Sequence, residues 1–278
     1  MGLAMVRDDS SNRLPDFLIM GAAKSGTTSL YHYLTQHPDI FMSYPLKEPR
    51  LFTDIDRIRT YFWQKRGIEI LSIEDLIENY MLQGYQGEKL FGEATADYTV
   101  GTFSQQYHIP QKIKKINPQM KFIYILRNPF ERIVSNYLHI LNLGLTTNAD
   151  INSFFEPNNR HGQIMLSTSL YYQQLKYYLT EFEREQFKIV IFEELISKPQ
   201  QHLSDIFTFL GLDNYGYSSY NFQAYNCSNK NLGTLCLKFD VRNYQFLVDL
   251  FRTDTLKLEN FLHRSLNLWD FSPQSWAI

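Results

Sequence analysis

The chain is poor in cysteine, nearly balanced in charge and without long apolar runs. Its 278 residues include two cysteines, Cys227 and Cys236, which excludes a fold that depends on disulfides and fits a reducing compartment. Its 27 basic and 29 acidic residues give a net charge of −2, so the charge favours neither nucleic acid nor an anionic membrane as a partner. No apolar run approaches a membrane span, and the opening "MGLAMVRDDSSNRLPDF" lacks the apolar segment of a secretion signal. We therefore expect a cytoplasmic protein.

The composition is that of a folded α/β chain. With 44% hydrophobic and 20% charged residues, the chain has enough apolar material for a full core. No repeat, low-complexity tract or long linker is visible. We expect a single domain over residues 1–278, with residues 1–14 as a flexible N-terminus. The least periodic stretches, residues 144–162 and 215–233, are expected to be loops, the first of them a lid or insertion on the substrate side.

Short apolar strands alternate with helical segments along the chain. "DFLIM" (Asp16–Met20) has the character of a buried strand that enters a glycine-containing loop, and a helix is expected over Thr27–His37. "KFIYIL" (Lys121–Leu126) and "FKIVIF" (Phe187–Phe192) indicate further strands, and the segment Ser167–Phe182 has helical spacing. This alternation predicts an α/β, P-loop-like fold of three layers, in which helices flank a central, mainly parallel sheet.

The loop after the first strand has the outline of a phosphate-binding loop with a displaced lysine. Gly21 and Gly26 have the spacing found in nucleotide triphosphatases, but Thr27 stands where those enzymes have lysine, and Lys24 precedes the second glycine instead. Successive amide and hydroxyl groups at a helix N-terminus still suit an anion without a metal. The expected anion-binding residues are Lys24, Ser25, Gly26, Thr27, Thr28 and Ser29.

A second candidate anion element follows the strand Lys121–Leu126. Arg127 comes at its carboxyl end, where open α/β sheets bind ligands, and a guanidinium group matches a phosphate dianion with two parallel hydrogen bonds. Ser135 lies about two turns into the next helix, where its hydroxyl can face the same anion. Alone, these residues are more simply explained as an exposed arginine and a solvated serine. Together with the first loop, they predict a site for a nucleotide with two anionic groups. Arg132 is expected to be solvated or salt-bridged.

Together, the motifs resemble those of sulfotransferases that use 3′-phosphoadenosine 5′-phosphosulfate (PAPS), particularly heparan sulfate sulfotransferases and their bacterial relatives. "GAAKSGTTSLYHYLTQHPDI" is similar to K-x-G-T-T-x-L followed by H-P. "LKEPRLF" resembles K-E-x-x-F-F, and "RNPFERIVSNY" resembles R-[ND]-P-x-x-R-x-x-S-x-Y. The resemblance continues to the terminal "LNLW" and so covers nearly the whole chain. It implies PAPS as the cofactor, 3′-phosphoadenosine 5′-phosphate (PAP) as the product, and no metal requirement.

The resemblance also implies catalytic roles. Glu48 corresponds to the family's catalytic carboxylate and would deprotonate the acceptor, while Lys24 and Lys47 would neutralise charge near the bridging oxygen. Glu93 corresponds to a charged residue on the acceptor side and is the alternative base. The C-terminal loop that would close over the 3′-phosphate contains Lys230, Asn231 and Gly233.

One departure from the family pattern bears on the acceptor. Ala94 stands where heparan-type relatives often carry lysine, which argues against an anionic polysaccharide. We expect a hydroxyl or amine of a small molecule, such as a bacterial natural product. No Cys, Ser or His nucleophile is recognisable, which predicts direct in-line transfer. A P-loop kinase-like enzyme and a noncatalytic PAPS-binding protein remain alternatives, and the sequence leaves oligomeric state and the choice between O- and N-sulfation open.

Overall fold

The computed structural model contains a central parallel β-sheet. It describes residues 13–100, 108–147, 150–213, 216, 220–223, 225 and 237–277. The strands are β1 (Phe17–Gly21), β2 (Ile40–Met42), β3 (Leu90–Glu93), β4 (Lys121–Leu126) and β5 (Phe187–Ile191). Their order is β2-β3-β1-β4-β5, and each neighbouring pair is parallel. The predicted α/β fold is confirmed, and the strands that precede the two anion elements, β1 and β4, are neighbours.

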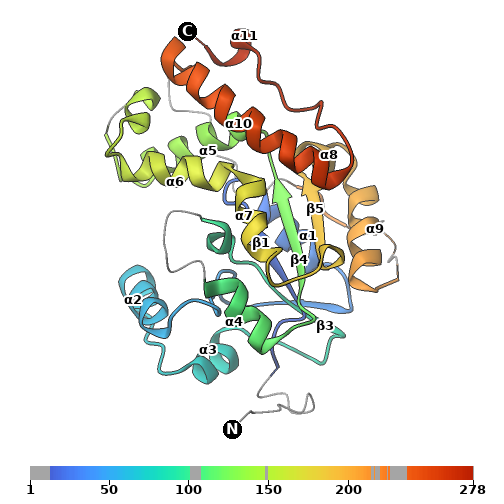
Figure 1. The fold of residues 1–278 in the computed structure, drawn as a ribbon. Coiled ribbons are helices and arrows are strands. Elements are labelled where there is room, and N and C mark those ends of the chain that lie inside the picture. The colour runs from blue at the N-terminus through green and yellow to red at the C-terminus, as the bar shows by residue number, and fades with distance from the viewer. Residues whose placement is uncertain are drawn as a thin grey trace.

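Helices cover both faces of this sheet (Figure 1). The α-helices are α1 (Thr27–Leu34), α2 (Ile55–Arg66), α3 (Ile73–Tyr80), α4 (Ile109–Ile116), α5 (Pro129–Asn142), α6 (Arg160–Ser169), α7 (Tyr171–Tyr178), α8 (Phe192–Ser197), α9 (Pro199–Leu210), α10 (Val241–Leu262) and α11 (Pro273–Trp276). The 3₁₀ turns are η2 (Ala96–Thr99), η4 (Ile151–Phe155) and η5 (Arg184–Gln186). Within the described ranges, no helix has both the length and the apolar character needed to cross a bilayer.

The three layers follow from the alternation of side chains along each strand. Phe17 and Ile19 of β1 are buried with residues of α1, α8 and α9. Leu18 and Met20 point to the opposite face, where they are buried with residues of α2, α3, α4 and α7. Because successive strand residues face opposite sides, a strand that is apolar throughout must be covered twice.

A third apolar cluster lies beyond the sheet. It includes Phe130 of α5, Met165 of α6 and Phe251 of α10, all fully buried. Figure 1 shows these helices gathered beyond the tips of the β4 and β5 arrows. The cluster therefore builds up the carboxyl edge of the sheet, the edge at which open α/β folds bind ligands.

One predicted helix is divided in two. The segment Ser167–Phe182 breaks at Leu170, which separates α6 from α7. The Asp254 carboxylate of α10 accepts hydrogen bonds from the N–H groups of Tyr172 and Gln173, at 2.9 and 3.0 Å. A carboxylate at this place caps a new helix start. The prediction of one helix is wrong because this tertiary contact has no local sequence signal.

The predicted loop over residues 144–162 is also partly regular. It contains η4 and the first turn of α6. A β-carbon on Gly162 would lie 1.5 Å from the carbonyl oxygen of Phe154, so this glycine marks a close approach of two segments. Of the second predicted loop, the structure describes residues 216, 220–223 and 225, and most of the predicted flexible N-terminus lies outside the described residues.

Candidate active site

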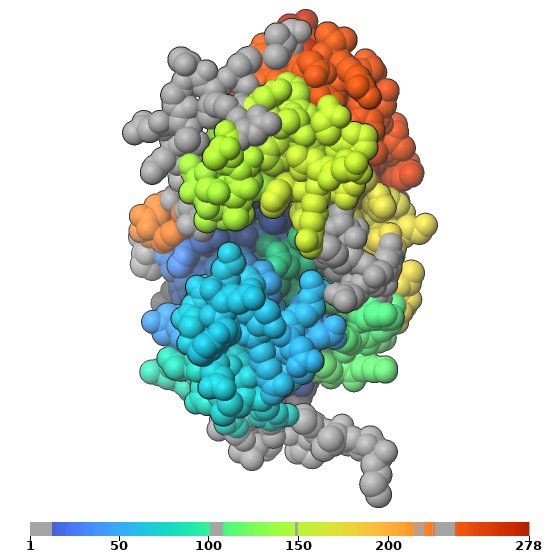
Figure 2. Space-filling view, turned by 90° about the vertical axis from the view of Figure 1, so that its left-hand side faces the viewer, coloured from blue at the N-terminus to red at the C-terminus, as the bar shows by residue number. Residues whose placement is uncertain are grey.

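A cavity of about 1010 Å³ opens between α2 and α6. Figure 2 shows it as a hollow between the cyan surface of α2 and the yellow-green surface of α6. The predicted site residues that line it together are Lys24, Gly26, Thr27, Thr28, Ser29, Glu48, Arg127 and Ser135. Both predicted anion elements and the candidate base therefore share one cavity.

Of the other predicted site residues, three are described, and none of these lines the cavity. Ser25 is fully buried beneath the loop, and Glu93 is fully buried at the end of β3. Lys47 forms an ion pair with Glu48, with 2.9 Å between Nζ and Oε1. The residues of the C-terminal loop predicted to cover the 3′-phosphate fall outside the described ranges; they are Lys230, Asn231 and Gly233.

Helix α1 begins without a side-chain cap. Gly26 is its N-cap residue and adopts a left-handed conformation with φ of 96°. The first hydrogen bond of the helix runs from the Leu30 N–H to the Gly26 carbonyl, at 3.0 Å. In the first turn of an α-helix the N–H groups point out of the N-terminus and not toward a carbonyl of the preceding turn. Together with the helix dipole, these groups suit a bound anion.

The loop before α1 is fixed by contacts on its inner side. The Ser25 N–H donates to the Ala22 carbonyl at 3.1 Å, so this amide is directed into the loop, and the role of Ser25 in ligand binding stays a prediction. A β-carbon on Gly26 would lie 2.6 Å from Cδ2 of Phe192, so glycine allows this ring to pack against the loop. Lys24 has a φ of 69°, a conformation that costs a non-glycine residue on the order of 1 kcal/mol. The surrounding loop must stabilise that conformation.

Arg132 is buried and joins the phosphate loop to α6. Its guanidinium donates to the carbonyl groups of Ala23 and Met165, at 3.2 and 2.6 Å. It also donates to Ser169 Oγ at 2.7 Å and to Asn136 Oδ1 at 3.2 Å. All four acceptors are neutral, so the expectation of a solvated or salt-bridged arginine is wrong. Burial lowers the Arg132 pKa to about 10, which leaves the side chain charged at neutral pH.

Positive charge accumulates on this side of the cavity. Burial lowers the pKa of Lys24, and the nearby charges of Arg127 and Arg132 lower it further. The Glu48 carboxylate acts in the opposite direction. A bound polyanion would reduce the repulsion among these three cations. The charges around the loop and the N-terminus of α1 therefore both favour an anionic ligand.

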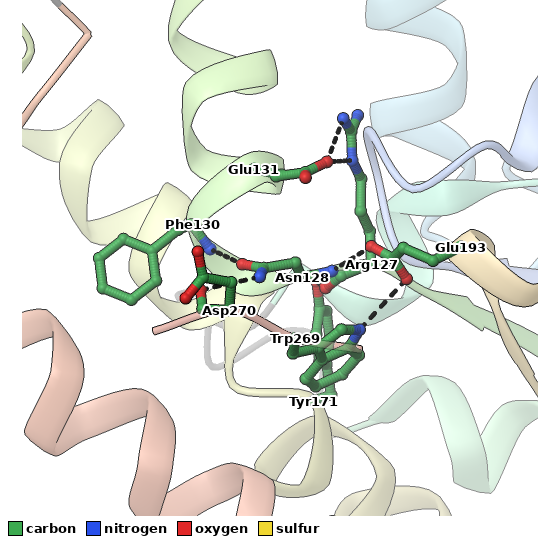
Figure 3. Close-up of polar contacts among 8 residues, drawn as sticks. All are labelled: Arg127, Asn128, Phe130, Glu131, Tyr171, Glu193, Trp269 and Asp270. Carbon is green, nitrogen blue, oxygen red and sulfur yellow. Dashed lines mark hydrogen bonds and ion pairs between the residues drawn. The ribbon is translucent and has the colours of Figure 1, made fainter. Parts of the chain in front are cut away.

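Arg127 is held through both its side chain and its backbone (Figure 3). Its Nε and Nη2 atoms donate to Glu131 Oε2, at 3.0 and 2.7 Å. The guanidinium carbon lies 5.0 Å from the centre of the Phe192 ring. The Tyr171 hydroxyl donates to the Arg127 carbonyl at 2.6 Å. These contacts within the protein fix the orientation of the Arg127 side chain along the cavity wall.

Asn128 connects this arginine to two distant segments (Figure 3). Its N–H donates to Glu193 Oε1 at 2.8 Å, and its Nδ2 donates to the Asp270 carbonyl at 3.0 Å. Its Oδ1 accepts the Phe130 N–H at 2.9 Å and so caps α5. The Trp269 indole donates to Glu193 at 3.2 Å, and burial raises the Glu193 pKa. Sequence reasoning missed this network, although asparagine directly before a proline is a helix-start signal.

The two candidate bases have different surroundings. Glu48 lines the cavity with 33% of its side chain exposed. Glu93 accepts hydrogen bonds from the hydroxyls of Thr95 and Tyr98, and burial raises its pKa to about 8. Glu93 therefore lies beneath the surface and not on the cavity wall. Ala94 is also buried in the core, so the absence of lysine there says nothing about the acceptor surface.

The cavity wall formed by α2, η2 and α4 carries charges of both signs. Arg50 pairs with Asp97, and Lys112 pairs with Asp54. The Arg50 guanidinium carbon lies 3.5 Å from the centre of the Tyr61 ring. All five residues line the cavity. This wall offers hydrogen-bonding groups and an aromatic side chain to an acceptor.

Known sulfotransferases are similar to this chain in sequence and fold. The human bifunctional heparan sulfate N-deacetylase/N-sulfotransferase 2 is 24% identical over 283 residues, which cover 93% of this chain and 30% of that protein. A solved sulfotransferase from Alicyclobacillus acidocaldarius has 26% identity and a TM-score of 0.73, covering 93% of this chain and 99% of its own. A mouse sulfotransferase complexed with PAP has a TM-score of 0.54 at 20% identity, covering 90% and 89%. The chain spans about half or less of the length of its curated relatives.

The family assignment rests on a match over most of the chain. A model of the sulfotransferase domain matches residues 14–232, which include β1 to β5, the phosphate loop and the Arg127 element. The chain belongs to the sulfotransferase domain family.

Proposed function

We propose that this chain transfers a sulfuryl group from PAPS to a hydroxyl or amine of a small-molecule acceptor. The observation that carries the proposal is the shared cavity in which the α1 N-terminus, Lys24, Arg127 and Glu48 meet. The family match supports the same reaction. Fold similarity to a sulfotransferase complexed with PAP agrees with a nucleotide of this kind.

The two anion elements match the two ends of such a nucleotide. The N–H groups of residues 27–29 and the Lys24 ammonium would hold the 5′-phosphosulfate. Arg127 and Ser135, which line the same cavity, would hold the 3′-phosphate. Arg132 adds buried positive charge beneath the loop without occupying the cavity. PAPS supplies an activated sulfuryl group with PAP as its leaving group.

Glu48 would act as the general base of a direct transfer. Its carboxylate accepts the proton of the acceptor hydroxyl or amine while the acceptor atom attacks sulfur, and the bond from sulfur to the 5′-phosphate oxygen breaks on the opposite side. Lys47, 2.9 Å from the Glu48 carboxylate, orients it. Lys24 neutralises the charge that develops on the leaving phosphate. No covalent intermediate on the enzyme is required.

The size of the cavity bears on the acceptor. Sites for one small ligand are about 300–1,000 Å³, and here about 1010 Å³ must hold both nucleotide and acceptor. The remaining space suits a small molecule or the end of a longer chain. The paired charges and the Tyr61 ring, which line the same cavity, would contact that group.

Titration calorimetry and a turnover screen test the proposal. We expect PAP and PAPS to bind more tightly than ATP with Mg²⁺, because Thr27 occupies the place of the triphosphatase lysine. Among the described residues, no group of three or more His, Cys, Asp or Glu side chains could hold a metal ion. Incubation with PAPS and a panel of phenols, alcohols, amines and oligosaccharides should yield a product heavier by one sulfuryl group. Preferred binding of ATP with Mg²⁺ would support the kinase-like alternative, and PAP binding without any turnover would support a noncatalytic role.

A further inference from the structure

The chain around Glu48 is anchored to the end of β3 and to η2. The Arg50 N–H donates to Thr95 Oγ1 at 3.2 Å, and the Phe52 N–H donates to the Tyr98 hydroxyl at 3.2 Å. Thr95 and Tyr98 are buried. Two backbone groups just after the candidate base are thus fixed by side chains about 45 residues further along the chain.

Glu93 determines the direction of both hydroxyl groups. Thr95 Oγ1 donates to Glu93 Oε1, and the Tyr98 hydroxyl donates to Oε2 at 2.9 Å. A hydroxyl has one proton, and a backbone N–H can only donate. Above the Glu93 pKa of about 8 the carboxyl is ionised and can only accept, so each hydroxyl gives its proton to Glu93 and its oxygen remains an acceptor for the backbone N–H groups. The carboxylate thereby orders two hydrogen-bond relays that end on the segment carrying Glu48.

Further contacts fix the chain on both sides of the candidate base. After it, the Arg50 side chain forms an ion pair with Asp97 of η2. Before it, the Leu46 carbonyl accepts a hydrogen bond from Ser43 Oγ at 2.5 Å, and the Leu46 N–H donates to the Tyr80 carbonyl at 3.2 Å. The residues between these anchors have little freedom to move relative to β3.

We propose that Glu93, Thr95 and Tyr98 are positioning residues that hold Glu48 toward the acceptor. The inference rests on the proposed function, in which Glu48 is the base. It replaces the alternative in which Glu93 is itself the base, since the Glu93 carboxylate is fully buried and both its oxygens accept hydroxyl protons. General-base catalysis depends on placement, and a shift of about 1 Å can lower a rate by about 100-fold.

Hydroxyl-deletion variants with a matched control test the relays. Thr95→Val removes one hydroxyl at nearly constant size, Thr95→Ser retains it, and Tyr98→Phe removes the other. We expect Thr95→Val and Tyr98→Phe to speed hydrogen–deuterium exchange in a peptide covering residues 46–53. Their kcat, measured above pH 8 with the best acceptor of the panel, should fall by about 10- to 100-fold. The affinity for PAP should stay at the wild-type value, and Thr95→Ser should restore most of kcat.

Several outcomes would overturn the inference. The first is a wild-type kcat in Thr95→Val and Tyr98→Phe under conditions where Glu48→Gln is impaired, which would leave the proposed function intact. The second is a loss of PAP affinity in proportion to kcat, which would indicate general disruption. The third is a Thr95→Ser variant as impaired as Thr95→Val. If Thr95→Val fails to fold, Tyr98→Phe and Thr95→Ser decide the question. A fully active Glu48→Gln would overturn both the inference and the proposed base.

Discussion

Replacing Asn128 with aspartate tests the hydrogen-bond network beneath Arg127. Aspartate keeps the oxygen that accepts the Phe130 N–H, so the α5 cap is retained. It removes Nδ2, which donates to the Asp270 carbonyl at 3.0 Å. It also introduces a second carboxylate near that of Glu193, which accepts the residue's own N–H at 2.8 Å. The substitution therefore changes one donor and one charge at nearly constant shape.

The expected magnitude follows from burial. Asn128 is 3% exposed, so water cannot readily replace the lost donor. An unsatisfied buried carbonyl costs about 1–3 kcal/mol, and repulsion between the carboxylates adds to this cost at neutral pH. We expect the free energy of unfolding to fall by about 2–4 kcal/mol, which for a chain of this size lowers Tm by roughly 5–10 °C.

The pH dependence of Asn128→Asp distinguishes this mechanism from a general packing defect. Burial and the Glu193 carboxylate raise the folded-state pKa of the introduced group above its unfolded value, so the variant loses stability as pH rises. When protonated, the carboxyl can donate to the Asp270 carbonyl as the amide does. Urea denaturation should thus show a larger deficit at about pH 8 than at about pH 5. Equal deficits at both pH values, or none at either, would refute the reasoning; Glu193→Gln is the background that should reduce the deficit.

Four further predictions concern the site. Arg127→Ala should weaken PAP binding, measured by calorimetry, by about 1.5–3 kcal/mol more than binding of an analogue without the 3′-phosphate; equal weakening would remove Arg127 from that subsite. Sulfuryl transfer should persist in excess EDTA, and a loss that Mg²⁺ reverses would contradict this. Glu48→Gln should lower kcat by about 10²–10⁴ at unchanged PAP affinity, whereas normal turnover would exclude it as the base. Because burial raises the Glu93 pKa to about 8, the free energy of unfolding should decline as pH rises from the ordinary glutamate range toward 8, and Glu93→Gln should flatten this decline in urea unfolding. The same pH dependence in the variant and the wild type would contradict this prediction.

Local sequence patterns predicted the strands that carry the site. The expected strand at Lys121–Leu126 is β4 itself, and Asp16–Met20 differs from β1 by one residue at each end. These strands are apolar on both faces, which gives a strong signal. The break at Leu170 was not predictable, because Asp254, which caps α7, is more than 80 residues away. The single-domain extent and the cytoplasmic location stay predictions.

The site residues were likewise predictable where the signal is local and unpredictable where it depends on distant residues. Residues within the loop motif were predictable because a helix N-terminus is a local structure. The burial of Arg132 was not, since its acceptors Met165 and Ser169 lie 33 and 37 residues away. The burial of Glu93 was not predictable for a related reason. Its sequence pattern marks the end of a strand but does not reveal that the segment following Glu48 hydrogen-bonds to Thr95 and Tyr98, whose hydroxyls donate to Glu93.

The Phe192 ring contacts both anion elements. It packs against Gly26, where a β-carbon would collide with it, and the Arg127 guanidinium lies 5.0 Å from its centre. A rigid aromatic group thus sets the separation between the helix N-terminus and the arginine. Ligands should consequently be selected by the distance between their two anionic groups more than by total charge. We therefore expect a triphosphate, whose charge is concentrated at one end, to bind less well than a ligand that carries an anionic group at each end.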